Sequence, residues 1–199
     1  MDDARTTTQH RPMPTMYLMV GLPGSGKTHR ARELAAEHAA VRLTPDEWAI
    51  SIFGNGDRHQ SRPDGMRWML EGRLVALALD LLGKGVSVVL DFGLWSRDER
   101  SALRWLAQSV GAQSQVVHLP AERDLQWARI RERLARDPDH NFPMDESERD
   151  AWLAGFEEPD AEELAEEAVP PPPEGDGSWF DWACRFWPSL AGSLDGRPA

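Results

Sequence analysis

Residues 16–28 read MYLMVGLPGSGKT, and this stretch decides the fold. The apolar run Met16–Val20 ends at Gly21, which is typical of a buried strand that leads into a tight turn. Residues 21–28 match the pattern G-x-x-x-x-G-K-[ST] at every fixed position, and apolar residues at helical spacing follow from Lys27 to about His38. A strand, a glycine-rich turn and a helix in this order predict a loop that binds phosphate groups.

This phosphate-binding loop (P-loop) predicts ATP and Mg²⁺ as cofactors. Glycines let backbone N–H groups approach phosphate oxygens, and the N-terminus of the following helix adds a partial positive charge. We expect Lys27 to act as a catalytic residue on the β- and γ-phosphates, and the Thr28 hydroxyl to ligate Mg²⁺. The expected nucleotide-binding residues are Gly21, Leu22, Pro23, Gly24, Ser25, Gly26, Lys27 and Thr28.

Asp91 is the expected second metal ligand. It directly follows Val86–Leu90, the most convincing buried strand predicted from the sequence. Ligands bind at the carboxyl edge of a parallel sheet, so a carboxylate beside the first strand can hold Mg²⁺ near Thr28. The alternative is an aspartate that caps the next turn.

Asp46 is the expected catalytic base. It follows a weaker predicted strand, Val41–Thr44, where it could contact the acceptor substrate and accept a proton from its hydroxyl. Pro45 at the first position of a helix, with Thr44 and Glu47 in a capping-box pattern, offers another explanation. An acidic residue in the first turn of a helix is favoured by the helix dipole alone.

Four arginines are candidates for contacts with phosphate or substrate. Arg129 and Arg133 are four residues apart on a predicted helix, Leu125–Arg136, and share one face of it. Phosphoryl transfer needs cations over the migrating group, although a solvated basic face would show the same pattern. Arg97 and Arg100 follow the third predicted strand and could hold an anionic substrate group, or they could be charges on a helix surface.

Predicted strands and helices alternate from Met16 to about Arg136, which indicates an α/β fold of three layers with a central parallel sheet flanked by helices. We expect a disordered N-terminal arm (1–15), a P-loop domain (16–165) with a lid over about 122–145, and an acidic, proline-rich C-terminal extension (166–199). The other predicted elements are a strand at Gln115–Leu119, helices at Met66–Leu82, Ser96–Val110 and Glu146–Phe156, and a loop at Phe53–Gly65.

Composition and charge exclude several classes of protein. Of 199 residues 41% are hydrophobic, enough for a core, and a single cysteine excludes a disulfide framework. No apolar run has the length of a membrane span, so we expect a cytoplasmic protein without membrane contact. Residues 1–136 carry 19 basic and 16 acidic side chains, whereas residues 137–199 carry 3 and 17. Without a basic stripe, we do not expect long nucleic acid as a partner.

The C-terminal extension ends in an aromatic segment, Trp179–Trp187, which follows the proline run Pro170–Pro173. Such a segment could bind a protein partner or fold back over the core of its own chain. Because a row of exposed aromatic side chains favours aggregation, we expect that it folds back.

Five segments in order resemble the small P-loop kinases, a group that contains polynucleotide 5′-kinases, zeta-type toxins and some antibiotic phosphotransferases. The resemblance covers about Met16 to Leu164 and is greatest to uncharacterised bacterial ATP-binding members of the group. The segments are the P-loop, LTPDEW (43–48), VVLDFGLWSRDER (88–100), the arginine-rich lid and FEEPDAEEL (156–164). The resemblance implies that Asp46 is the general base and that Arg129 and Arg133 are lid arginines.

Two departures leave the acceptor open. Ala49 stands where polynucleotide kinases carry an arginine for the 3′-phosphate of the acceptor, and the sugar-nucleotide contacts of zeta-type toxins are not found. The leading hypothesis is therefore a kinase that phosphorylates a hydroxyl of a small molecule. The alternatives are a kinase of nucleic-acid 5′-OH ends, and a nucleotide-dependent switch or binding module with slow ATP hydrolysis.

Overall fold

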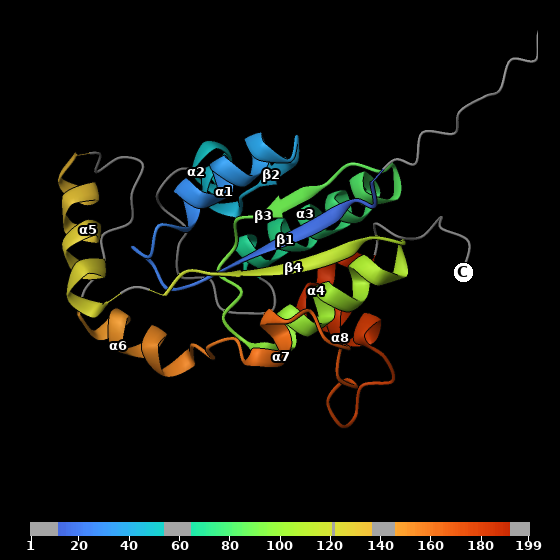
Figure 1. Ribbon diagram of the computed structural model, residues 1–199. Coiled ribbons are helices and arrows are strands. Elements are labelled where there is room, and N and C mark those ends of the chain that lie inside the picture. The colour runs from blue at the N-terminus through green and yellow to red at the C-terminus, as the bar shows by residue number, and fades with distance from the viewer. Residues whose placement is uncertain (1–11, 54–64, 121, 137–145, 192–199) are drawn as a thin grey trace, which may run out of the picture.

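A parallel sheet of four strands, in the order β2-β3-β1-β4, forms the centre of the computed structural model, which describes residues 12–53, 65–120, 122–136 and 146–191 (Figure 1). The strands are β1 (Thr15–Val20), β2 (Val41–Leu43), β3 (Val88–Leu90) and β4 (Gln113–His118). All three strand pairs are parallel. The predicted α/β fold with a central parallel sheet is confirmed.

Helices follow the strands, as the alternation of patterns predicted. The longer ones are α1 (Lys27–Glu37), α2 (Pro45–Phe53), α3 (Met66–Gly83), α4 (Arg97–Ser109), α5 (Arg123–Arg136), α6 (Glu146–Gly155) and α8 (Trp179–Phe186). Two single-turn helices, α7 (Ala161–Leu164) and α9 (Pro188–Ala191), complete the described chain. Residues 1–11 of the predicted arm, 54–64 of the predicted loop and 137–145 of the predicted lid lie outside the described residues.

The two faces of β1 supply two hydrophobic clusters. Met16, Leu18 and Val20 belong to the larger cluster, whereas Tyr17 and Met19 belong to the smaller one. This division follows from the alternation of side chains along a strand. Helices α3 and α4 cover the larger cluster and α1 covers the smaller one, so the sheet lies between two helical layers (Figure 1).

The aromatic segment folds back, as expected. Helix α8 packs against α4, and α9 packs against α3. Trp179, Trp182 and Trp187 are buried in the larger cluster, where the ring of Trp182 meets the rings of Trp179 and Trp187 edge-on and stacks on Phe186. This burial removes the three tryptophans from the surface that a partner could contact. Over the residues described here, no helix is both long enough and apolar enough to cross a bilayer.

Candidate nucleotide and phosphoryl-transfer site

The P-loop leaves β1 at Gly21 and wraps to the N-terminus of α1. Gly24 and Gly26 have φ of +80° and +99°, in the left-handed region that glycine adopts without strain. A Cβ at Gly24 would lie 2.7 Å from the carbonyl oxygen of Gln126 on α5, so the loop and this helix are in direct contact. A Cβ at Gly26 would meet nothing within 4 Å, which leaves open space at the start of α1.

The residues of this loop fit the phosphates of a nucleotide. Helix α1 has Gly26 as its N-cap, without a hydrogen bond from a capping side chain, so its first N–H groups face that open space. The Ser25 hydroxyl is buried and has no hydrogen-bond partner in the described part of the chain. Unpaired donors beside Lys27 are the groups that phosphate oxygens would satisfy.

Lys27 stands at the centre of a cluster of charges. Its Nζ donates to the carbonyl oxygen of Leu22 at 2.9 Å. Burial lowers the pKa of Lys27 from 10.5 to about 8, although the carboxylates of Asp91 and Asp46 oppose this shift and Arg133 adds to it. The fold therefore brings both predicted carboxylates and one predicted lid arginine into electrostatic range of the P-loop lysine.

Asp91 lies next to the P-loop, as predicted, because β3 pairs with β1. The carboxylate is buried, and the Thr28 hydroxyl lies close enough to influence its pKa. Burial raises the pKa of Asp91, while Arg42, Lys27 and Thr28 act in the opposite direction. A carboxylate and a threonine hydroxyl side by side are oxygen ligands of the kind that Mg²⁺ prefers, so both residues fit the expected metal site.

Sequence reasoning missed Arg42, which lies on β2. Its Nε donates to Asp91 at 3.0 Å, and its Nη2 lies 2.7 Å from Glu47 on α2. Glu47, expected to close a capping box, thus accepts hydrogen bonds from Arg42 and also from Arg32 on α1. The sequence does show that Arg42 lies on a predicted strand. Only the pairing of this strand, β2, with β3 brings Arg42 next to Asp91.

Asp46 lies in the first turn of α2 with half of its side chain exposed. Its Oδ1 accepts a hydrogen bond of 2.5 Å from Nη1 of Arg67 on α3, a residue that sequence reasoning also missed. Asp46 and Arg67 both interact electrostatically with Lys27. The predicted base is therefore close to the P-loop, and an unforeseen arginine holds it.

The two lid arginines lie on α5, beyond the carboxyl ends of the strands (Figure 1). Nη1 of Arg129 lies 3.3 Å from the carbonyl oxygen of Gly24, and Arg133 interacts with Lys27. Arg131 instead stacks over the ring of Trp127 at 5.9 Å. One face of α5 thus presents two cations to the P-loop.

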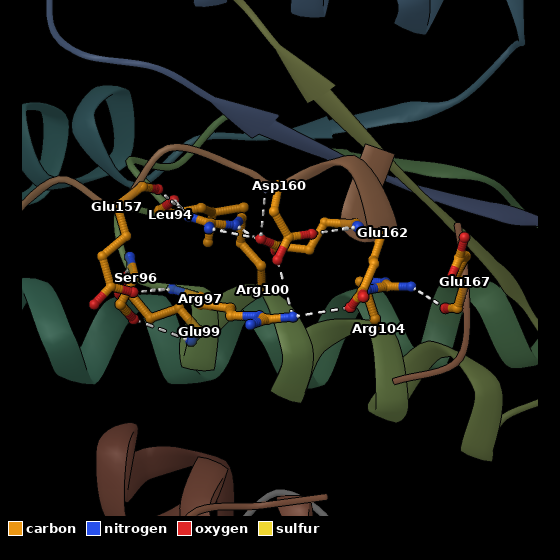
Figure 2. Close-up of polar contacts among 11 residues, drawn as sticks. Leu94, Ser96, Arg97, Glu99, Arg100, Arg104, Glu157, Asp160, Glu162 and Glu167 are labelled. Atoms are coloured by element: carbon orange, nitrogen blue, oxygen red, sulfur yellow. Dashed lines mark hydrogen bonds and ion pairs between the residues drawn. The ribbon is translucent and has the colours of Figure 1, made fainter. Parts of the chain in front are cut away.

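The expected role in substrate binding is wrong for Arg100, because its side chain has no exposed surface. Its Nε and Nη2 donate to the carboxylate of Glu163 at 2.7 and 3.0 Å, and its Nη1 donates to the carbonyl oxygens of Leu94 and Glu157 (Figure 2). Arg100 is not a charge on a helix surface either. The acidic segment around α7 folds onto α4 and encloses it.

Arg97 is held in a similar way at the edge of this network. Its Nη2 lies 2.9 Å from Asp160 and 3.3 Å from Glu162, with 44% of the side chain exposed (Figure 2). Ser96 and Glu99 form the capping box that the sequence predicted at the start of α4. The network fixes the segment that follows Asp91 rather than offering a free anion site.

Comparisons with known proteins place the chain in a family. A family model described as an AAA domain matches residues 16–159. A search of curated proteins found no match.

Solved structures with this fold are similar to most of the chain. Kti12 from Chaetomium thermophilum, in complex with ADP-AlF3, is 19% identical with a TM-score of 0.59, over 92% of this chain and 100% of that one. A gluconokinase from Sinorhizobium meliloti 1021 is 18% identical with a TM-score of 0.53, over 93% of this chain and 95% of that one. The APS kinase CysC from Mycobacterium tuberculosis, in complex with AMPPNP and APS, is also 18% identical (TM-score 0.53, 93% and 99%). At this identity the likeness shows the fold, and the resemblance to small P-loop kinases is confirmed at that level.

Proposed function

The chain belongs to the AAA domain family, and from this membership and the site we propose that it is an ATP- and Mg²⁺-dependent phosphotransferase acting on a hydroxyl of a small molecule. One observation carries the proposal: Asp46 lies in electrostatic range of Lys27. A loop that only binds nucleotide needs no carboxylate there, whereas transfer to an alcohol needs a group that takes its proton.

In this mechanism the P-loop binds the phosphates through its backbone N–H groups, Ser25 and Lys27. Asp46 orients the acceptor hydroxyl and takes its proton as the oxygen forms a bond to the γ-phosphorus. The bond between that phosphorus and the β–γ bridging oxygen breaks, and ADP leaves. Lys27, Arg129 and Arg133 stabilise the negative charge on the transferring group.

Thr28 and Asp91 would hold Mg²⁺, which supplies charge neutralisation on the phosphate oxygens when it is bound. The Thr28 hydroxyl lies close enough to Asp91 to lower the pKa of its carboxylate, which supports these two residues as neighbouring ligands. Arg42 donates a hydrogen bond to the buried carboxylate of Asp91 and lowers its pKa, which opposes the effect of burial.

A small acceptor is supported by the neighbours in fold, which include a gluconokinase and an APS kinase. Nucleic acid as the acceptor finds less support, because Ala49 on α2 has no cationic side chain to pair with a 3′-phosphate.

ADP release from ATP and Mg²⁺ tests the proposal. Wild type, Lys27→Ala and Asp46→Asn are each assayed alone and with pools of hydroxylated metabolites, antibiotics, nucleosides and 5′-OH oligonucleotides. Asp80→Asn, an exposed carboxylate near the far end of α3, is the matched control. We expect one small-molecule pool to raise turnover in wild type and in the control, but in neither site variant.

Two other results would contradict the proposal. Stimulation by oligonucleotides alone would identify a 5′-OH kinase. No stimulation by any pool, with Asp46→Asn hydrolysing ATP like wild type, would favour a nucleotide-dependent switch.

A further inference from the structure

A chain of hydrogen bonds connects Asp46 to the C-terminal extension. Asp46 Oδ1 accepts from Nη1 of Arg67 at 2.5 Å, and Nε of the same guanidinium donates to Glu71 Oε1 at 3.1 Å. The other oxygen of Glu71 accepts from the indole Nε1 of Trp187 at 3.2 Å. Asp46 lies on α2, Arg67 and Glu71 lie on α3, and Trp187 directly follows α8.

The two residues at the far end of this series of hydrogen bonds, Glu71 and Trp187, are deeply buried. Glu71 is 4% exposed and Trp187 is fully buried. A buried carboxylate is costly unless its oxygens receive charge and hydrogen bonds, and here Arg67 and Trp187 each serve one oxygen. Two donors on opposite oxygens fix the rotation of the Glu71 carboxylate.

Arg67 transmits this orientation to Asp46. The guanidinium is planar and rigid, so anchoring Nε on Glu71 determines where Nη1 points. Burial lowers the pKa of Arg67, but the carboxylates of Asp46 and Glu71 outweigh it and hold the pKa above the ordinary value. Arg67 therefore stays charged and ties two carboxylates from different helices together.

The extension is seated on the turn of α3 that carries the buried carboxylate. A Cβ at Gly72 would lie 3.1 Å from the Cβ of Trp187, so the backbone of α3 and the extension are in close contact. The Ser189 hydroxyl donates to the carbonyl oxygen of Met69 at 2.6 Å. Packing and polar contacts thus place the Trp187 indole at one position relative to α3.

We propose that Trp187 and Glu71 are positioning residues that act through Arg67 to hold Asp46 in place beside Lys27. The C-terminal extension, which lies outside the family match to residues 16–159, would then complete the acceptor side of the site. This inference rests on the proposed function in assigning a catalytic role to Asp46, and the linkage to Arg67 can be tested without it.

The test uses two tryptophans with similar surroundings. Trp187→Phe removes the indole donor to Glu71 and keeps an aromatic ring. Trp179→Phe is the matched control, because Trp179 is also buried in the larger cluster and its Nε1 donates to the carbonyl oxygen of Pro170 at 2.7 Å. If Trp187→Phe fails to fold, Glu71→Gln replaces it, since an amide keeps the shape but removes the charge that anchors Arg67.

The first measurement is the ¹⁵N-detected Nε–H signal of Arg67, assigned with Arg67→Lys, together with its rate of exchange with water. We expect Trp187→Phe to shift this signal and to speed its exchange at least severalfold, while Trp179→Phe leaves it unchanged. An unchanged signal in Trp187→Phe overturns the linkage whether or not the protein is a kinase.

The second measurement is acceptor-dependent ADP release by the same variants. We expect Trp187→Phe to lower kcat on the order of tenfold with little change in the KM for ATP, as misplacement of a reacting group does. In an Asp46→Asn background the substitution should have no further effect, because it acts through Asp46.

The positioning role would be overturned if Trp179→Phe lowered kcat as much as Trp187→Phe does. It would also be overturned if Trp187→Phe lowered kcat equally in the Asp46→Asn background. If no acceptor stimulates wild type, the proposed function fails and the catalytic half of this inference fails with it. The Arg67 signal then still decides whether the extension holds this arginine.

Discussion

Nε of Arg42 lies 3.0 Å from Oδ2 of Asp91, and this contact joins strands β2 and β3 at the edge of the sheet that carries the P-loop. The Asp91 side chain is 3% exposed and the Arg42 side chain 14%. The same guanidinium reaches Glu47, one residue after the proposed base Asp46. Arg42 therefore couples the proposed metal ligand to the helix on which the proposed base stands.

Removing Arg42 should destabilise the protein. Arg42→Met leaves the buried Asp91 without its nearest cation, and we expect a loss of about 2–4 kcal/mol in the free energy of unfolding. Urea denaturation at pH 7 measures it. Arg30→Met is the control, because the ion pairs of Arg30 with Glu33 and Glu37 are exposed and should contribute little. Equal changes in both variants would show that Asp91 does not depend on Arg42.

Replacing Lys27 should stabilise the nucleotide-free protein. Its pKa is lowered from 10.5 to about 8, so the unfolded chain binds more protons between these values and stability rises with pH across that window. The cost of burying the charged amine is fully present below pH 8. We therefore expect Lys27→Met to gain roughly 1–3 kcal/mol near pH 7 and little at pH 10.5.

Thermal unfolding at both pH values checks this, with the exposed Lys84→Met as the control. A gain that is the same at pH 7 and pH 10.5 would point to better packing by methionine rather than to relief of a buried charge.

ATP affinity should fall above pH 8. Deprotonation of Lys27, with its pKa of about 8 in the free protein, removes a positive charge that the phosphates need. We expect ATP binding, followed by calorimetry, to weaken by up to about tenfold per pH unit beyond that point. Lys27→Arg stays charged, so the fall should disappear in this variant; its persistence there would assign the titration to another group.

The two lid arginines should act on the chemical step. We expect Arg129→Ala and Arg133→Ala to lower kcat by about ten- to a thousandfold, since cations over a transferring phosphoryl group stabilise its charge. Arg131→Ala lies on the same helix but stacks on Trp127, so it should retain most activity. Steady-state kinetics with the identified acceptor separate these outcomes, and equal losses in all three variants would indicate damage to α5 as a whole.

Breaking the Arg100–Glu163 pair should strongly lower the free energy of unfolding. Arg100→Met leaves Glu163, which is 1% exposed, as an unpaired buried carboxylate, with an expected loss of about 3–5 kcal/mol. The double variant with Glu163→Leu should recover part of this loss, because both charges are then gone. Chemical denaturation of Arg100→Met, Glu163→Leu and the double variant measures the coupling energy between the two residues. If the losses of the single variants simply add in the double variant, the predicted coupling is wrong.

The sequence predicted the P-loop, the strands, the longer helices up to α6 and the burial of the aromatic segment, but it did not predict α7, α8 or α9. These features are local, because the spacing of apolar residues, the capping patterns and the glycines each act within a few residues. The same local logic placed Asp91 at the end of a strand and Asp46 at the start of a helix. Whether these two carboxylates would meet at Lys27 depended on the strand order.

Tertiary structure alone decided which charges find each other. Arg100 meets Glu163 across 63 positions of the chain, and Trp187 meets Glu71 across 116. No periodic pattern encodes such pairs, because they arise only when distant segments fold over the same helix and the cost of burying each charge selects its partner. The sequence by itself therefore determined where phosphates could bind, whereas the packing of residues 157–190 determined which polar residues are structural and which remain available to the site.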